Sequence, residues 1–277
     1  MFDYLNSKLG LPNQHLFLNK EFDKKSFTTY LKYDYAPFLE LESPEAYRSS
    51  HKSKFWYNIR RSRRLIEEEF GKLEFHIKKN KFVLHHIDEC REIFLERWKN
   101  EYTSFSWKND MKYEKWKETI LKLADNSQFE LNYLTINSQI EAYCFGFIID
   151  NTYFLFLHAI SPKISDNRFS IGTILIDETI RSCIDRKIDQ FDFMVGTSQY
   201  KLKFTRKIKP VYWRVTTKKK FLNIPSHIIK VLFFSLKINL QKNKNSRTLF
   251  KLVFKKLSLF RGSLRIINWL ESNLFKM

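Results

Sequence analysis

A run of small residues, RFSIGT (168–173), precedes a helix-period pattern and has the residue types that bind phosphate. The N–H groups of a first helical turn lack intrahelical partners and carry the positive end of the helix dipole, so they attract anions. Gly172 would let the backbone approach a pyrophosphate, and Ser170 would cap the helix. The competing interpretation is an ordinary capped helix start with a solvated arginine. The candidate cofactor-binding residues are Arg168, Ser170, Ile171, Gly172 and Thr173.

A second stretch, FDFMVGTSQYKLKF (191–204), carries candidate catalytic groups. Asp192 lies in an apolar strand, where a carboxylate needs a partner or a catalytic role. The phenol of Tyr200 can protonate a leaving thiolate, and the ammonium of Lys201 can hold a substrate anion. His158, on an earlier strand, is a candidate base. The simpler interpretations are a carboxylate bonded to a backbone turn, a hydrogen-bonded histidine, and surface side chains at positions 200 and 201.

Cysteine and histidine spacing predicts neither a disulfide framework nor a metal site. Cys90, Cys144 and Cys183 form no CxxC pair, and no HxxxH or HExxH spacing occurs. An odd number of scattered cysteines fits a reducing compartment. The first residues do not resemble a signal peptide, and no run of 18 apolar residues is present. We therefore expect a cytoplasmic protein without a metal.

The net charge of +19 is concentrated near the carboxyl end of the sequence. Residues 218–277 hold 14 Lys and Arg residues against one acid, Glu271. Apolar and basic residues alternate there at helical spacing over 221–277, which is typical of a helix that lies on an anionic membrane surface. A helical pair packed on the domain, with a basic outer face, explains the pattern equally well. Nucleic acid is a further anionic partner that such charge favours.

Hydrophobic periodicity predicts an α/β domain with a mixed, mostly antiparallel central sheet flanked by helices. Residues 1–50 are irregular, with strand-like character near 27–35. Turns are expected at Asn137-Ser138 and Asp150-Asn151, and a crossover helix should make the strands before and after it parallel. The expected strands are 73–79, 129–136, 140–150, 152–160, 188–194 and 211–217, and the expected helices are 53–70, 87–100, 111–126, 173–186 and a brief one within 196–205.

The chain should therefore consist of a reduced N-terminal segment (1–52), a central domain (53–217) and a basic helical extension (218–277). An arginine-rich run, Arg60 to Arg64, lies on the first helix of the central domain. It could bind nucleic acid. Three glutamates follow it, at 67 to 69, so a solvated face with i,i+4 ion pairs is the favoured interpretation.

The order of these motifs resembles the GNAT acyltransferase fold. Within it, the resemblance is to the branch of Fem-type aminoacyl transferases and polysaccharide-associated CelD-like acetyltransferases. It covers about residues 35–217, and the segment DQFDFMVGTSQYKLKFT, with its D-F, G and Y-K positions, is the most specific part. The other matching segments are APFLEL (36–41), FWYNIRRSRRLIEEEFG (55–71), LNYLTINSQIEAYCFGFIIDNTYFLFLHAISP (131–162) and SIGTILIDETI (170–180).

The resemblance implies acetyl-CoA or another acyl-CoA as co-substrate, with its pyrophosphate at the Gly172 helix start. An amine would attack the thioester directly, and backbone N–H groups of strand 152–160 would polarise the carbonyl. The sequence departs from the family's phosphate loop, Q/R-x-x-G-x-G/A, at two positions, which are Asn167 and Ser170 here. It also has Ile160-Ser161 in place of the usual aromatic-Asp pair.

The sequence is compatible with three functions. The leading hypothesis is an acyl-CoA-dependent N-acyltransferase for an amino sugar or another small amine, in surface polysaccharide synthesis. The second is aminoacyl transfer from tRNA to a peptidoglycan precursor. The third is a non-enzymatic protein on the same scaffold that binds membrane or nucleic acid through its basic residues.

Overall fold

The computed structural model describes residues 14–15, 26–99, 106–124, 129–166 and 168–218, with single helical residues at 228, 231, 232, 235 and 238. The chain divides into two compact units. One contains Asp34–Pro210, called the body below, together with Met1–Pro12. The other contains Asn13–Tyr33 and Val211–Met277. Every candidate site residue lies in the body.

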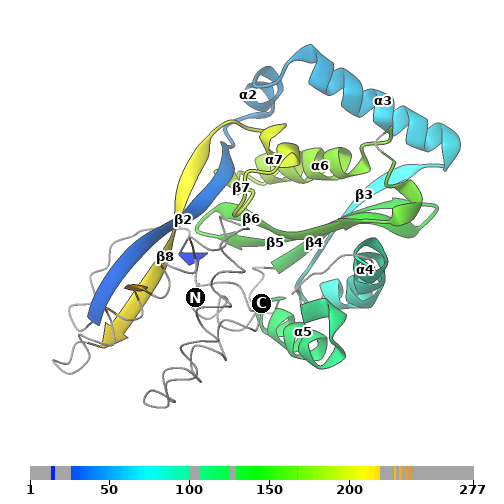
Figure 1. Cartoon of the computed structure of the whole chain (residues 1–277). Coiled ribbons are helices and arrows are strands. Elements are labelled where there is room, and N and C mark those ends of the chain that lie inside the picture. The colour runs from blue at the N-terminus through cyan, green and yellow to red at the C-terminus, as the bar shows by residue number, and fades with distance from the viewer. Residues whose placement is uncertain are drawn as a thin grey trace, which may run out of the picture. The chain divides into compact units, whose positions relative to one another are not determined.

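Helices and strands alternate along the body, and two strands continue into the other unit (Figure 1). These two are β2 (Ser26–Glu40) and β8 (Ile208–Lys218). In the other unit, β1 (Gln14–His15) pairs antiparallel with β8. The remaining elements are α2 (Pro44–Ser49), α3 (Ser53–Glu69), β3 (Leu73–Lys79), η1 (Asn80–Val83), α4 (Leu84–Arg97), η2 (Ser106–Lys108), α5 (Asp110–Ala124), β4 (Phe129–Ile136), β5 (Gln139–Ile149), β6 (Thr152–Ile160), η3 (Pro162–Ile164), α6 (Ile171–Asp185), β7 (Gln190–Asp192) and α7 (Gln199–Leu202).

The central sheet is mixed and mostly antiparallel, as the sequence predicts. Across the body its strand order is β2-β7-β6-β5-β4-β3, and the β6–β7 pair is parallel. The crossover helix α6 joins these two strands. Both hairpin turns are confirmed, because Asn137 and Ser138 have φ values of 50° and 65°, and Asp150 and Asn151 have 46° and 55°. Two consecutive left-handed residues are the geometry of a tight type I′ hairpin.

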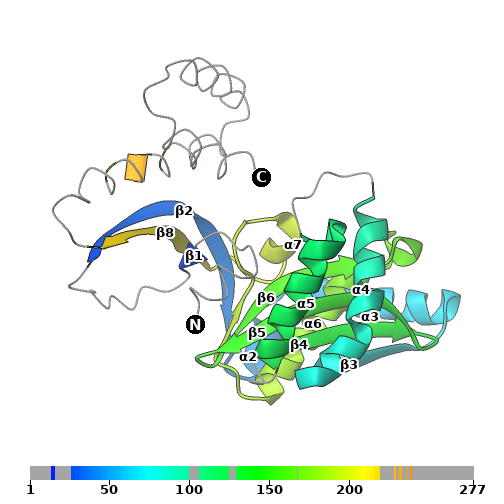
Figure 2. The same ribbon diagram turned by 90° about the horizontal axis from the view of Figure 1, so that it is seen from below.

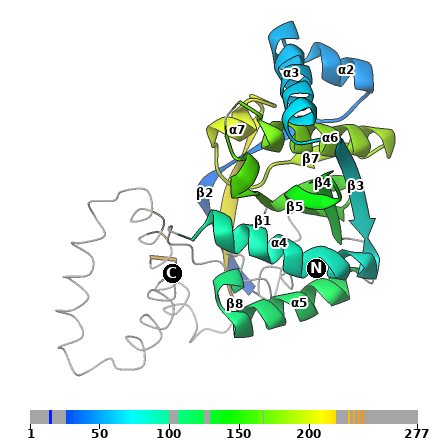
Figure 3. The same ribbon diagram turned by 90° about the vertical axis from the view of Figure 1, so that its right-hand side faces the viewer.

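Helices cover both faces of the sheet. Helices α3 and α6 lie on one face, and α4 and α5 lie on the other (Figures 2 and 3). The α6 face is mostly aliphatic, whereas the α4–α5 face is aromatic. On the aromatic face, Trp107 contacts Trp116 edge-on with ring centroids 4.8 Å apart, and both contact Phe145. Such rings bury large apolar areas, so each face has its own core.

The predicted elements agree with the structure in type and order except near the N-terminal side of the body, and β7 is shorter than the strand predicted at 188–194. Strands β3, β4 and β6 have the predicted bounds. Helix α2 was not predicted, although its start has a recognisable signal: Ser43 accepts a hydrogen bond from the Ala46 N–H, and Pro44 follows at the first helical position. Residues 27–35 belong to one longer strand, β2.

Two expectations reach beyond what the structure describes. The basic extension, 218–277, falls almost wholly outside the described residues, and so does its membrane-binding segment 221–277. The three-part division of the chain at 52 and 217 stays a prediction. None of the described helices is long and apolar enough to cross a membrane.

Candidate active site

Strands β6 and β7 pair over three residues only. Thr152, Tyr153 and Phe154 pair with residues 190–192. Strand β7 then ends, while β6 continues to Ile160. Among the described strands, none pairs with 155–160 on the β7 side. This half of β6 therefore presents a backbone edge that can hydrogen-bond to an extended ligand.

A bulge lies at the start of this edge. Phe145 pairs with Leu157 and Gly146 with Leu155, so Phe156 is an extra residue on β6. A bulge bends its strand and increases the local twist. It therefore changes the direction of β6 where its pairing with β7 ends.

Three of the candidate catalytic residues lie near this edge. The rings of His158 and Tyr200 have centroids 4.9 Å apart. Burial lowers the pKa of His158 to about 4, and the Lys201 ammonium adds to this effect. Burial raises the pKa of the Tyr200 phenol well above its usual range. At neutral pH both rings are therefore uncharged, and the same shifts make the imidazole a weaker base and the phenol a weaker acid than they are in water.

Lys201 is buried and holds the loop that follows β7. Its ammonium donates to the carbonyl oxygens of Val195, at 2.7 Å, and Met194, at 3.2 Å. Burial lowers the pKa of Lys201 to about 8, against the opposing effect of Asp192. Met194 and Gly196 have φ values of 57° and 98°, so the loop has an unusual backbone that these contacts help to fix.

The partly buried His158 predicts a specific dependence of stability on pH. The folded imidazole stays neutral down to about pH 4, whereas in the unfolded chain it protonates near pH 6.5. Between these values the unfolded state binds more protons, so this residue makes the free energy of unfolding fall as the pH is lowered. Above pH 6.5 this residue does not make the free energy of unfolding depend on pH.

We therefore expect the melting temperature of His158→Gln to fall less steeply than that of the wild type between pH 6.5 and 4. Differential scanning calorimetry at a series of pH values measures both slopes. Parallel curves for the two proteins would contradict a buried neutral histidine.

Asp192 has the partners that a buried carboxylate requires. It is fully buried. One oxygen accepts the Met194 N–H at 2.6 Å, and the other lies 2.5 Å from the ammonium of Lys209. Burial raises its pKa, and Lys209 opposes this effect. The contacts match the simpler interpretation, a carboxylate bonded to a neighbouring turn, and a catalytic role stays a prediction.

Close packing explains the glycine in the first turn of α6, Gly172. A Cβ atom on Gly172 would lie 2.7 Å from Cδ1 of Ile160, so the glycine lets the helix start approach the end of β6. Ser170 occupies the N-cap position without a side-chain cap hydrogen bond, and its φ and ψ are 44° and 34°. The expected serine cap is therefore absent at this helix. Ser170 has a left-handed backbone, which glycine adopts readily. The GNAT phosphate loop has a glycine at this position.

Arg168 is turned toward acidic side chains. Its Nε donates to Asp166 at 3.0 Å, and its Nη1 lies 3.6 Å from a carboxylate oxygen of Glu69. The guanidinium also lies over the ring of Phe169. Of the phosphate-site candidates, Ser170 and Thr173 line the pocket at the α6 start, and Arg168 does not.

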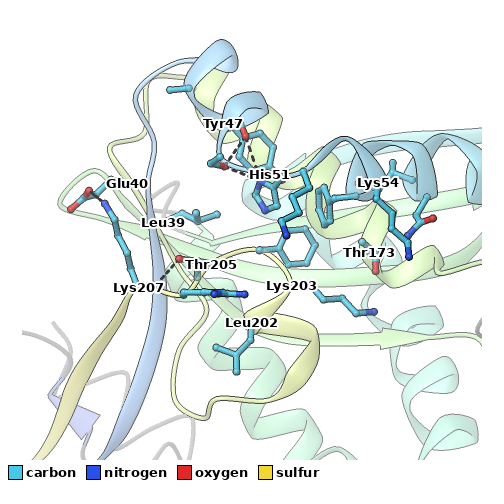
Figure 4. A pocket seen from close by; sticks show the side chains of 18 of the residues that line it. Leu39, Glu40, Tyr47, His51, Lys54, Thr173, Leu202, Lys203, Thr205 and Lys207 are labelled. Carbon is cyan, nitrogen blue, oxygen red and sulfur yellow. Dashed lines mark hydrogen bonds and ion pairs between the residues drawn. The ribbon is translucent and has the colours of Figure 1, made fainter.

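The pocket at the α6 start has a volume of about 1040 Å³ and was not predicted (Figure 4). Helices α2 and α3 and the segment 202–207 form its other walls. Its charged lining consists of Glu40, Glu42, Lys52, Lys54, Lys203, Arg206 and Lys207, and His51 also lines it. The sequence signal was the run Lys203, Arg206 and Lys207 directly after Tyr200-Lys201. Nothing in the sequence indicated that helix α2 would face it.

No group of three or more His, Cys, Asp or Glu side chains in the described part of the chain is arranged to hold a metal ion. The three cysteines are buried and free.

A comparison with protein families decides the class of the chain. The family described as "Acetyltransferase (GNAT) domain" matches residues 53–202, more than half of the chain. The chain belongs to this family. It is a GNAT-type acyltransferase, and the domain implies an acyl-CoA co-substrate. The expected fold and enzyme class are thus confirmed.

Solved structures show more distant likenesses. L-PGS from Bacillus licheniformis is 12% identical, with a TM-score of 0.48, over 76% of this chain and 67% of that one. A conserved protein of unknown function from Bacteroides thetaiotaomicron is 14% identical, with a TM-score of 0.47, over 72% and 64%. The PaiA N-acetyltransferase from Thermoplasma acidophilum, in complex with coenzyme A, is 16% identical, with a TM-score of 0.34, over 42% and 75%.

These likenesses leave the substrate open. The chain spans about two thirds of the length of the first two structures. No curated protein matches the sequence. The Fem-type and CelD-like branch therefore stays a prediction.

Proposed function

We propose that the protein is an acyl-CoA-dependent N-acyltransferase that acylates an amino sugar or another small amine, in the synthesis of a surface polysaccharide. The observation that carries the acyl transfer is the edge of β6 at 155–160, with which no described strand pairs on the β7 side and which lies beside His158 and Tyr200. The acceptor class and the polysaccharide setting follow from the resemblance of the sequence to CelD-like enzymes. Free cysteines fit a cytoplasmic location.

The described residues fit an acyl-CoA donor at three places. The first-turn N–H groups of Ile171 and Gly172 suit a pyrophosphate, whereas the Thr173 N–H donates to the Ser170 carbonyl oxygen at 2.8 Å. The cationic pocket adjoins that helix start. The free edge of β6 suits the amide groups of a pantetheine arm and the thioester carbonyl, whose developing negative charge its N–H groups would stabilise.

The proposed reaction uses neutral side chains at the edge of β6. By its place beside the edge of β6, His158 is the proposed acceptor of the proton that the attacking amine loses as the new C–N bond forms. Tyr200, whose ring contacts that of His158, is the proposed donor of a proton to the sulfur as the C–S bond breaks. The backbone N–H groups of 155–160 stabilise the oxyanion between these two steps. The ammonium of Lys201 donates to the carbonyl oxygens of Met194 and Val195 and so fixes the loop that follows β7.

A thermal-shift titration with acetyl-CoA and longer acyl-CoAs tests the donor. At a concentration of 100 Kd, a ligand stabilises the folded state by about 2.7 kcal/mol, or about 5–10 °C for a unit of this size. We expect Gly172→Glu to lose most of this shift, since it places a carboxylate where the pyrophosphate would bind. Gly172→Ala is the control for the steric contact with Ile160.

Two outcomes would reject the donor assignment. One is the absence of stabilisation by any acyl-CoA. The other is a wild-type shift in a folded Gly172→Glu variant. Transfer of a labelled amino acid from charged tRNA would instead support the Fem-type alternative.

The third hypothesis, a protein without enzymatic activity, is not retained, because the chain belongs to an acyltransferase family. Binding of an anionic membrane surface through 221–277 stays a prediction that can coexist with catalysis. The small-molecule amine remains the proposed partner, and tRNA is a partner only under the alternative.

A further inference from the structure

We propose that the protein forms a homodimer in which strand β3 pairs antiparallel with β3 of a second copy. The strand's sequence, LEFHIKK, is complementary to itself in charge and in apolar character when two copies run in opposite directions. The inference is independent of the acyl-transfer proposal, because strands β4 and β5 lie between β3 and the edge of β6.

Strand β3 is the last strand at one side of the body's sheet. It pairs with β4 along its whole length, and among the described strands none pairs with its other side. Figures 2 and 3 show it at the outer border of the sheet. A described side chain reaches its backbone at the first residue, where Arg63 donates to the Leu73 carbonyl oxygen at 3.3 Å. The rest of the strand therefore offers backbone groups that can pair with another extended chain.

Charges on β3 match when two copies pair about His76. Glu74 then lies opposite Lys78 of the second copy, and a two-fold axis repeats this ion pair. Within the described residues Lys78 forms no ion pair, and Glu74 lies 2.6 Å from the exposed Lys72. Lysines on a free edge commonly prevent pairing, but here a carboxylate stands at the position that faces the lysine.

The two faces of the sheet restrict the register of this pairing. Phe75 packs against the aliphatic core that α6 covers, and a two-fold axis perpendicular to the sheet keeps that face on the same side in both copies. The register can therefore change only in steps of two residues. One such step places Lys72 opposite Lys78, and the other places Phe75 opposite Lys79. Of these three registers, the one about His76 pairs a carboxylate with an ammonium.

Two exposed aromatic side chains flank β3 at equal distances from His76. Phe70, before the strand, is 38% exposed, and Phe82, after it, is 56% exposed. Together with residues 77–80, Phe82 lines a hollow of about 530 Å³ at the end of the strand. The two-fold axis brings Phe70 of one copy toward this hollow on the other. Aromatic residues are enriched in protein interfaces, so both ends of the edge fit a second copy of the chain.

Sedimentation velocity of the full chain over a concentration series tests the proposal. A pair of seven-residue strands with flanking rings makes a small interface, so we expect a Kd of about 1–100 μM. The variants are Glu74→Lys and Lys78→Glu, alone and combined in one chain. Lys115→Glu, an exposed charge reversal on α5, is the matched control. Calorimetric melting checks that every variant is folded.

We expect the Kd of dimerisation to rise at least about tenfold in each single variant, because like charges then face each other at two symmetric positions. An equimolar mixture of Glu74→Lys and Lys78→Glu should form a heterodimer, since the two reversed charges lie opposite each other. The chain with both changes should dimerise again, because each pair is once more complementary. Lys115→Glu should behave as the wild type does.

Three results would overturn the proposal. One is a wild type that stays monomeric at about 100 μM, the weak end of the expected range. Another is a dimer that persists in both single variants, which would assign the contact to a different surface. The third is monomeric single variants that neither mixing nor the combined change restores. The thermal shift with acyl-CoA is a separate readout and should equal that of the wild type in every variant, so a monomeric protein leaves the proposed function intact.

Discussion

We expect Gly146→Ala to lower the melting temperature of the protein by about 6–12 °C, because it overpacks the sheet beside the active-site bulge. A Cβ atom at this position would lie 2.1 Å from Cζ and 2.5 Å from Cε2 of Tyr153. Overpacking a core costs up to about 3 kcal/mol, or more where nothing can move. For a unit of this size, each kcal/mol corresponds to about 2–4 °C.

The ring of Tyr153 has little room to move away from position 146. It is fully buried and stacks on Phe191 with centroids 4.9 Å apart. Its hydroxyl accepts a hydrogen bond from Asn132 at 2.9 Å. The strain of an added methyl group therefore passes into β5 and β6 rather than into a side-chain rotation.

A double-mutant cycle checks this cause. Tyr153→Leu alone should be destabilising, but adding Gly146→Ala to it should cost less than about 1 kcal/mol, because the clash is gone. Calorimetric melting of the four proteins measures the coupling. Additive effects of the two changes would show that Gly146 matters for another reason.

The second large effect is expected at Asp192. Asp192→Ala should reduce the free energy of unfolding by about 3 kcal/mol, since removal of one member of a buried ion pair is strongly destabilising. Here the group left behind is the ammonium of Lys209, which also donates to Gln190 at 2.8 Å and lies over the ring of Phe38. The Met194 N–H also loses its acceptor.

Urea unfolding of Asp192→Ala measures this loss as a lower midpoint. Asp189→Ala removes an exposed carboxylate three residues away and is the matched control, with an expected change within about 0.5 kcal/mol. Replacing both Asp192 and Lys209 by leucine should be less harmful than Asp192→Ala, because both members of the ion pair are removed together. An unchanged midpoint together with lost activity would instead assign Asp192 a catalytic role.

Local sequence determined the order and type of most elements of the body. Period-two and helical patterns predict β3 to β6 and α3 to α6 because each element buries one face against the sheet or a helix. The two hairpin turns follow from their polar residues, which tolerate a left-handed backbone. These signals depend on neighbours in the chain, so one sequence suffices to detect them.

The contacts of the candidate site residues could be seen only in the tertiary structure. Asp192 meets Lys209 and Gly172 meets Ile160, and the sequence contains no local mark of either pairing. The pocket depends on α2, α3 and 202–207 meeting at the start of α6, segments separated by more than 100 residues. Contacts across such distances follow from the packing of whole elements. The phosphate-binding role of the α6 start stays a proposal, and its glycine has a steric reason that only the fold shows.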